Sequence, residues 1–297
     1  CEKDKKMKTL TVFTPTYNRA HTLARTYKSL CNQTCNDFEW LVIDDGSVDN
    51  TEELVKGWIV EGRISIRYIK KENGGLHTGY TMAIANMETE LNVCIDSDDF
   101  MPDNGVEIIV TTWKNECRGK NLAGIIGLDY LLDGTPNGGM FANEGIYHIY
   151  EIRGFHRGDD KKVCRTDLLK ALKPMPVFEG EKNFNPIYYY IQVDAQYKFQ
   201  VINKNLCFID YQPDGMSAGI FRQFRDSPHS FAQLRRLYMS MNYEKWTTHF
   251  RNSIHYVSSC IFGKEWDFLK TSPRPFTTLL AIPLGILLNI YICYKTR

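Results

Sequence analysis

The feature that most restricts the fold is a repeated alternation of short apolar runs with helical patterns over the first 130 residues. Runs rich in β-branched and aromatic residues predict four strands, at residues 10–14, 40–43, 64–69 and 91–95. Helical patterns separate them, at residues 21–30, 50–58 and 76–87. This alternation is typical of a parallel sheet covered by helices, so we expect an α/β fold with a Rossmann-like, mostly parallel central sheet.

The remainder of the chain is predicted to add further elements and a helical extension. We expect strands at 122–128 and 206–211, and helices at 104–114, 166–172, 188–199, 230–246 and 253–269. Gly and aromatic residues dominate from about 129 to 158, where no clear pattern emerges. The net charge of +1 gives no support for nucleic-acid binding, which usually requires a clearly basic domain.

Polar or glycine-rich loops follow each of the first four predicted strands. They contain Thr14 to Tyr17, then Asp44 and Asp45, then Asn73 to Gly75, and finally the acidic stretch Asp96-Ser97-Asp98-Asp99. Because the carboxyl ends of parallel strands meet at one edge of a sheet, these loops are expected to converge there and to form a ligand site.

The acidic stretch is the most informative of these loops. Like charges this close repel, so two or three carboxylates are costly to ionise unless a cation lies among them. The alternative is a polar turn or a helix N-terminus, but the convergence of the four loops favours a ligand site. Asp-x-Asp suits a divalent metal bridging a diphosphate, with Asp98 as the direct metal ligand and Asp96 towards the ribose.

The segments TVFTPTYNR, LVIDDGSVDNT, KKENGGLHTGYTMAIANMETE and NVCIDSDDF occur in this order. Together they closely resemble the nucleotide-sugar half of the family-2 inverting glycosyltransferases of bacterial surface-polysaccharide type, which have the GT-A fold. The resemblance implies a UDP-sugar or other nucleotide-sugar donor and Mg²⁺ or Mn²⁺ at Asp96 and Asp98. It also implies further donor-binding residues, namely Thr14, Pro15, Tyr17, Asp44, Asp45, Lys71, Gly75 and Ser97. For Asp44 and Asp45, a helix-entry turn is the competing interpretation.

An inverting transfer needs a general base to take the proton of the acceptor hydroxyl. In the resembled family this base is an acid just before a helix in the second half of the domain. Here Glu181 is the first choice, followed by Glu179 and Asp194, and a surface acid balanced by Lys182 is the alternative for Glu181. Lys161 is expected in a flexible segment, where it either faces the diphosphate or acceptor or is a solvated charge.

The C-terminal segment 276–294 carries no charged residue and, as a helix, would cover about 28 Å, close to one hydrocarbon core. We expect a glycosyltransferase domain over 1–220, with a nucleotide-sugar half at about 8–105 and an acceptor half at about 106–220. Residues 221–297 are expected to form helices that include this membrane-associated segment. The expected location is the cytoplasmic face of the bacterial plasma membrane, peripheral or monotopic, with a glycan or lipid-linked acceptor.

Two other functions fit parts of the pattern. A sugar-nucleotide nucleotidyltransferase shares a related sheet but usually has a Gly-rich basic loop after its first strand, where this chain has Pro15-Thr16-Tyr17-Asn18-Arg19. A non-catalytic nucleotide-sugar-binding scaffold would fit if the base were missing. The acids at 96 and 98 favour the enzyme.

Overall fold

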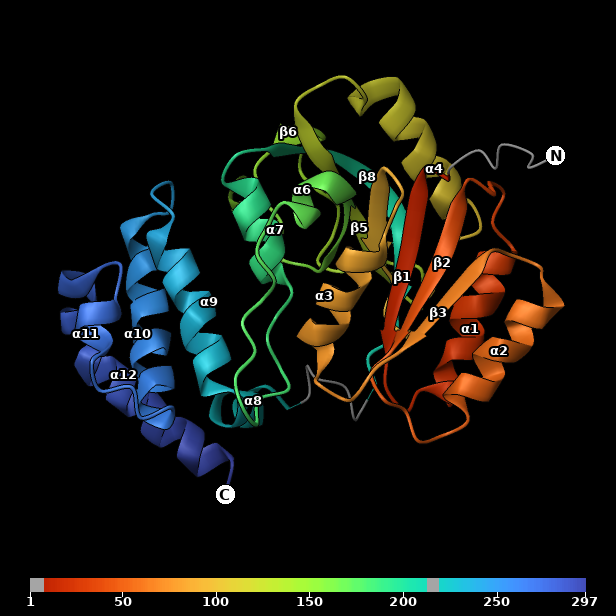
Figure 1. Ribbon diagram of the computed structural model, residues 1–297. Helices are drawn as coiled ribbons and strands as arrows, with labels where there is room; N and C mark the ends of the chain where they lie inside the picture. The colour runs from red at the N-terminus through yellow and green to blue at the C-terminus, as the bar shows by residue number, and fades with distance from the viewer. Residues whose placement is uncertain (1–7, 213–218) are drawn as a thin grey trace. The chain divides into compact units, whose positions relative to one another are not determined.

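The computed structural model describes residues 8–212 and 219–297, which fall into two compact units (Figure 1). The first unit contains the residues up to 74 together with 79–173 and 192–211. The second contains 75–78, 174–191 and 212–297. Residues 174–191 group with the C-terminal helices rather than with the sheet, and the expected domain boundary after residue 220 stays a prediction.

The first unit is built on one eight-stranded sheet with the order β3-β2-β1-β4-β7-β5-β8-β6. Its strands are β1 (Leu10–Thr16), β2 (Phe38–Asp44), β3 (Ile66–Lys70), β4 (Leu91–Cys94), β5 (Leu122–Leu131), β6 (Gly145–Tyr147), β7 (Asp160–Arg165) and β8 (Lys198–Ile209). The pairs β1–β2, β1–β4, β2–β3 and β5–β8 are parallel, whereas β7 and β6 run antiparallel to their neighbours. The mostly parallel sheet confirms the predicted α/β class.

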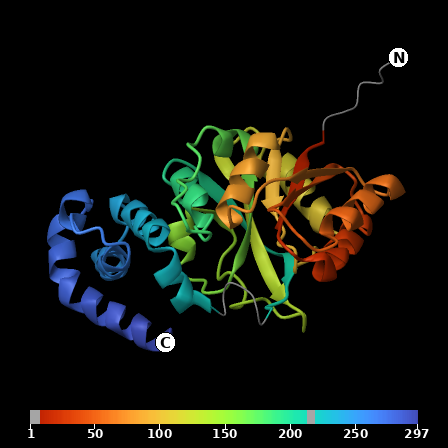
Figure 2. The same cartoon turned by 60° about the horizontal axis from the view of Figure 1, so that its bottom comes forward.

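Helices cover both faces of this sheet (Figures 1 and 2). The helices of this part of the chain are α1 (Ala20–Cys31), α2 (Thr51–Glu61), α3 (Leu76–Asn86), α4 (Gly105–Thr112) with the short π-helix η1 (Trp113–Cys117), α5 (Ile149–Ile152) and α6 (Thr166–Lys170). A further helix, α7 (Ile187–Asp194), has residues in both units. On the face covered by α1 and α2, the rings of Tyr27, Trp40 and Trp58 stack within the main core. On the opposite face, Phe13 packs edge-on against Tyr80 of α3. The alternation of side chains along β1 thus places its apolar residues on both faces, as a doubly covered strand requires.

Two predictions in the second half of the sheet were wrong. The helix expected at 188–199 ends at Asp194, and a single strand, β8, begins at Lys198 and includes the strand expected at 206–211. Phe199, Val201 and Ile202 are aromatic or β-branched, and Lys198 and Gln200 alternate with the first two of them; parallel pairing with β5 decides the conformation of this stretch. Lys161 does not lie in a flexible segment, since it belongs to β7 in the middle of the sheet.

The second unit contains the C-terminal helices α8 (Ile220–Asp226), α9 (Pro228–Ser240), α10 (Trp246–Phe262), α11 (Phe268–Thr271) and α12 (Pro275–Lys295). The helices expected at 230–246 and 253–269 are therefore shifted. The second of them ends at Phe262 because Gly263 and Lys264, the latter with a positive φ of 56°, turn the chain.

The helix α12 packs along α10 through its small residues. A Cβ on Gly285 would lie 2.6 Å from Cβ of Val257, so only glycine permits this approach. The side chain of Asn289 donates a hydrogen bond to the carbonyl oxygen of Ser258 at 3.2 Å. The apolar C-terminal segment is thus one helix that is attached along its length to a second, more polar helix.

Candidate functional site

Three loops of the first unit meet where the order of the strands reverses. From β1 the sheet extends through β2 to β3 on one side and begins with β4 on the other. Thr16 at the end of β1 pairs with Asp44, and Phe13 pairs with Cys94 at the end of β4. In open α/β sheets, such a switch point at the carboxyl ends of the strands is where ligands bind. The loops after β1, β2 and β4 therefore border one candidate site, as their sequence predicts.

The two acids after β2 have different environments. Asp44 is fully buried; its carboxylate accepts a hydrogen bond from the backbone N–H of Ser47 at 2.7 Å and another from the hydroxyl of Tyr68. These bonds close the turn and hold β3 beside β2, which supports the turn interpretation for Asp44.

Asp45 instead organises the loop after β3. Its carboxylate lies 2.5 Å from Nζ of Lys71 and accepts hydrogen bonds from the backbone N–H of Gly74 at 3.0 Å and from the side chain of Asn73 at 3.2 Å. The structure thus brings together Asp45 and Lys71, which the sequence assigned to one nucleotide site.

The residues after β1 divide in the same way. Thr14 is fully buried, and its hydroxyl accepts a hydrogen bond from the indole N–H of Trp40 at 3.0 Å, so its side chain belongs to the core. Pro15 is also buried, whereas Tyr17 exposes 47% of its surface. Of this segment, Tyr17 has the side chain that a ligand at the sheet edge can reach.

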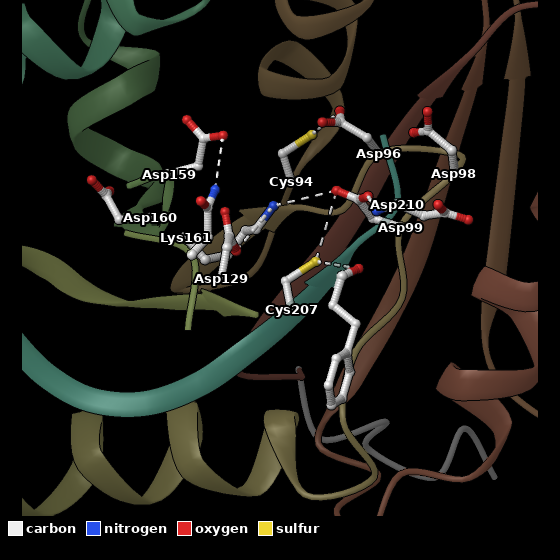
Figure 3. Close-up of polar contacts among 12 residues, drawn as sticks. Cys94, Asp96, Asp98, Asp99, Asp129, Asp159, Asp160, Lys161, Cys207 and Asp210 are labelled. Atoms are coloured by element: carbon white, nitrogen blue, oxygen red, sulfur yellow. Dashed lines mark hydrogen bonds and ion pairs between the residues drawn. The ribbon is translucent and has the colours of Figure 1, made fainter. Parts of the chain in front are cut away.

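The acids after β4 point in two directions (Figure 3). Asp96 is exposed and Asp98 half-buried, whereas Ser97 and Asp99 are buried. Burial, reinforced by the neighbouring Asp96, raises the pKa of Asp98 above its usual value. Two neighbouring carboxylates are thus presented at the rim of the site, and the charge of Asp96 disfavours the ionised form of Asp98.

These two acids have the chemistry of a divalent-cation site completed by a substrate. Within residues 8–212 and 219–297, neither Asp96 nor Asp98 forms an ion pair with a Lys or Arg side chain. The same residues contain no cluster of three His, Cys, Asp or Glu side chains that could hold a metal alone. Mg²⁺ is commonly bound by one or two carboxylates together with phosphate oxygens. Asp96 and Asp98 fit that pattern.

The third acid, Asp99, faces the interior and meets a lysine that the sequence did not place there (Figure 3). Nζ of Lys161 lies 3.8 Å from Oδ2 of Asp99 and 3.6 Å from Oδ1 of Asp129 on β5. Burial alone would lower the pKa of Lys161, but the carboxylates of Asp129 and Asp99 raise it well above its usual value, so this lysine is charged. The sequence did contain a signal for this position. Val163 and Cys164 follow shortly after Lys161, and these two apolar residues indicate a buried strand.

Glu181 and Gly75 belong to the second unit. The carboxylate of Glu181 is buried and accepts hydrogen bonds from the backbone N–H groups of His229 and Ser230, both at 2.8 Å, and from the Ser230 hydroxyl at 2.6 Å. Nδ1 of His229 lies 2.7 Å from the same carboxylate, which therefore caps the N-terminus of α9. A Cβ on Gly75 would lie 2.0 Å from the carbonyl oxygen of Lys182, so the chain itself requires glycine there.

The other two candidates for the base have different surroundings. Glu179 is exposed, two residues before Glu181. Asp194 is buried, and its carboxylate accepts a hydrogen bond from the backbone N–H of Ile149 at 2.7 Å and lies 3.2 Å from Nδ1 of His148.

Comparison with known families identifies the class of protein that this fold and site define. Residues 11–157 match the family model described as glycosyl transferase family 2. This match confirms the resemblance drawn from the motifs of that part of the chain.

Curated relatives share this part of the chain. Poly(ribitol-phosphate) beta-N-acetylglucosaminyltransferase TarP of Staphylococcus aureus is 26% identical over 201 residues, which are 67% of this chain and 51% of that protein. Chondroitin synthase of Pasteurella multocida is 28% identical over 134 residues, which are 45% of this chain and 13% of that protein. The chain thus spans only part of the length of these relatives.

Solved structures support the fold over almost the whole chain. The structure of S. aureus TarS 1–349 in complex with UDP-GlcNAc superposes with a TM-score of 0.67 at 14% identity, covering 97% of this chain and 92% of that one. The mannosyltransferase PcManGT of Pyrobaculum calidifontis, in complex with GDP-Man and Mn²⁺, superposes with a TM-score of 0.55 at 14% identity and covers 97% of this chain and 88% of that one. The fold is the GT-A fold that the motifs implied.

The buried Asp129 should give the stability of the protein a defined pH dependence. Burial raises the pKa of Asp129 to about 6, against the opposing attraction of Lys161; Asp159 and Asp160 raise it further and Lys162 lowers it. The folded protein therefore binds this proton more tightly than the unfolded chain, whose Asp titrates near ~3.9. The resulting stabilisation is complete below about pH 4 and is lost as the pH rises towards 6.

We expect the free energy of unfolding of the wild type, relative to Asp129→Asn, to fall by up to about 3 kcal/mol between pH 4 and 7, measured by urea unfolding. Asp133→Asn is the control of opposite sign, because hydrogen bonds from Thr135 lower the pKa of Asp133. A wild-type advantage that stays constant with pH would contradict the proposed burial of an ionisable Asp129.

Proposed function

We propose that this chain is a metal-dependent inverting glycosyltransferase that moves a sugar from a UDP-sugar to a hydroxyl of a glycan or lipid-linked acceptor. The observation that supports this most directly is the pair Asp96 and Asp98, which are presented without a lysine or arginine ion pair in the described part of the chain at the switch point of a GT-A sheet. N-acetylglucosamine is the first sugar to test, because it stands in the name of TarP and in the TarS complex.

The donor-binding roles follow from the environments of the loops. Asp45, tied to Lys71 and Asn73, offers a pre-organised edge for the base or ribose of a nucleotide. Tyr17 supplies an exposed ring in the loop after β1, whereas Thr14 and Asp44 position the backbone of their loops from within. Pro15 and Ser97 contribute backbone to the same rim, and Gly75 keeps the following loop close to Lys182.

Asp98, with Asp96 beside it, would hold Mn²⁺ or Mg²⁺ together with the diphosphate oxygens. When bound there, such a metal would supply Lewis-acid stabilisation of the departing nucleoside diphosphate. The raised pKa of Asp98 in the free protein is consistent with this role, because a bound cation would favour the ionised carboxylate.

Replacing Asp98 tests whether the chain is an enzyme or a non-catalytic scaffold that binds a nucleotide sugar. With UDP-GlcNAc and Mn²⁺, we expect Asp98→Asn to lower kcat/KM for donor hydrolysis or transfer by at least about 100-fold, since one oxygen ligand of the metal is lost. Asp103→Asn, an exposed acid that follows the same loop, is the matched control and should retain activity. Donor binding without turnover in the wild type would support the scaffold instead, and turnover of a nucleoside triphosphate with a sugar phosphate would support a nucleotidyltransferase.

For the general base we propose Glu181, whose carboxylate is buried and fixed by the first turn of α9. Four hydrogen-bond contacts hold the two oxygens in place, and one of them, from Nδ1 of His229, depends on the tautomer of that ring. This fixed orientation suits a residue that must meet an acceptor hydroxyl in one geometry.

Two variants distinguish catalysis from helix capping. Glu181→Gln should lower kcat by about 10²- to 10⁴-fold with little change in the donor KM, because general-base catalysis is lost. Ser230→Ala removes a hydrogen bond to the same carboxylate but keeps the acid, so it should lower Tm while kcat stays within about threefold of the wild type. Equal losses of Tm in the two variants, with kcat per folded molecule unchanged, would show that Glu181 only caps α9, and Glu179→Gln would then be the next variant to assay.

We further propose that the chain binds a membrane surface through the outer face of α12. Of the described residues, only this helix is long and apolar enough to cross a bilayer. Large apolar side chains line its exposed face, namely Phe276, Leu279, Leu280, Leu284, Ile286, Leu287, Ile290, Tyr291 and Tyr294. Its other face is attached to α10, which carries an exposed Arg251 and the buried polar side chains of Asn252 and His249.

Insertion across the bilayer would bring these polar groups of α10 towards the hydrocarbon, which is costly, whereas a helix lying in the interface keeps them in water. The proposed arrangement is therefore monotopic, at the cytoplasmic face of the plasma membrane, where nucleotide sugars are available.

Vesicle flotation of the full chain tests this arrangement. On phosphatidylethanolamine–phosphatidylglycerol vesicles, we expect the wild type to float and to be released by alkaline carbonate, and Leu284→Glu/Leu287→Glu to remain in the dense fraction. Val60→Glu, at an apolar residue of α2 that is 87% exposed, is the matched control and should float normally. Undiminished flotation of the double variant would contradict the surface, and resistance to carbonate would indicate a spanning helix.

A further inference from the structure

Lys161 is a buried cation at the centre of the first unit's acidic edge. Its side chain is 11% exposed, and the carboxylates beside it, those of Asp99 and Asp129, are 8% and 4% exposed. β7 pairs with both β4 and β5, so Lys161 lies beside the strand that carries the acidic loop and beside the strand that carries Asp129. The carbon stem and ammonium of one side chain therefore connect two parts of the sheet at the rim of the donor site.

Asp99 transmits this contact to the acidic loop. Its Oδ1 accepts a hydrogen bond from the backbone N–H of Asp210, at the end of β8, at 3.1 Å. Its backbone N–H donates to the carbonyl oxygen of Asp96 at 3.0 Å, and its own carbonyl oxygen accepts a hydrogen bond from the hydroxyl of Thr26 at 2.7 Å. The orientation of the Asp99 side chain is thus coupled to the turn that presents Asp96 and Asp98.

The charges require a cation at this position. Asp129 Oδ1 is buried and accepts no hydrogen bond within the described residues, so the ammonium of Lys161 is its main compensation. Removing one partner from a buried charge pair leaves the other charge uncompensated. Loss of the Lys161 ammonium would therefore remove a contact that holds the Asp99 side chain in place, and with it the turn to which Asp99 is bonded.

We propose that Lys161 is a positioning residue for the donor site, whose ammonium, held between Asp99 and Asp129, keeps the 96–99 turn in the conformation that presents Asp96 and Asp98 to the metal and diphosphate. The proposal rests on the proposed function of that site. The expected change in metal affinity distinguishes this role from simple electrostatic repulsion. A cation that merely lay near the metal would repel it, so removing that cation would tighten metal binding, whereas removing a positioning residue should weaken it.

The experiment compares Lys161→Met, Lys161→Arg and the double variant Asp129→Asn/Lys161→Met with a matched control, Lys162→Met. Lys162 is the next residue of β7, and its ammonium pairs with Asp160 at 2.6 Å, away from Asp99. The double variant removes one acid together with the lysine, so it restores the local charge balance without restoring the contact to Asp99. Three quantities are measured: Tm, amide hydrogen exchange of residues 95–101 in the metal-free protein, and the dissociation constant of Mn²⁺ with UDP by electron paramagnetic resonance.

We expect Lys161→Met to speed exchange in 95–101 and to weaken Mn²⁺ binding with UDP by about 10- to 100-fold, the usual effect of losing support for a metal ligand. The double variant should recover Tm but not the affinity, and Lys161→Arg and Lys162→Met should bind within about threefold of the wild type.

Equal or tighter Mn²⁺ binding by Lys161→Met would overturn the proposal, as would full recovery of affinity and protection in the double variant, because Lys161 would then only balance Asp129. If the wild type binds no Mn²⁺ with UDP, the proposed function fails. The exchange measurement then decides separately whether Lys161 holds the loop, and unchanged exchange in Lys161→Met would overturn that as well.

Discussion

The structure depends on how negative charge is compensated at the carboxyl edge of the sheet. A parallel sheet brings the ends of its strands to one edge, and in this chain most of those ends carry aspartates. Lys71 pairs with Asp45, Lys161 lies between Asp99 and Asp129, and Arg25 pairs with Asp210 at 2.8 Å. Because carboxylates this close cannot all remain ionised without cations, each pair makes the packing of one loop possible. Asp96 and Asp98 form no such pair in the described part of the chain, and they are the acids assigned to the metal.

This division gives the site a rigid frame and a reactive rim. The frame consists of side chains that are buried and bonded within the protein, such as Asp44 beneath its turn and Thr14 beneath the indole of Trp40. The rim consists of side chains that remain accessible, such as Tyr17 and Asp96. In the proposed function, a divalent cation that binds together with a diphosphate would supply the positive charge that the protein does not place beside Asp96 and Asp98, in a loop that is already held in place.

The second unit is organised by different forces. Its helices are joined by small-residue packing at Gly285 and by the capping of α9 by Glu181, not by a sheet. One consequence is that the carboxylate of Glu181 would serve two purposes: it stabilises the N-terminus of α9, and it is the proposed acceptor of the proton. Another is that α12 has an unusually apolar outer face without being free to leave α10, which is why a position in the membrane interface agrees with its packing better than a span.

The sequence by itself determined the fold class, the four strand–loop units of the first half and the family. Those features depend on local patterns: alternation of apolar residues, glycines in turns, and acids directly after apolar strands. It also indicated that Asp45 and Lys71 serve one site, because successive parallel strands must end at the same edge. Only the tertiary structure decided which acids are compensated, since Lys161 of β7 pairs with Asp129 and Asp99, which lie 32 and 62 positions before it in the chain. It likewise decided that residues 198–202 form a strand and not the end of a helix. Strand pairing and ion pairing depend on contacts between segments that are distant in the sequence. A local sequence pattern does not show which distant segments come into contact.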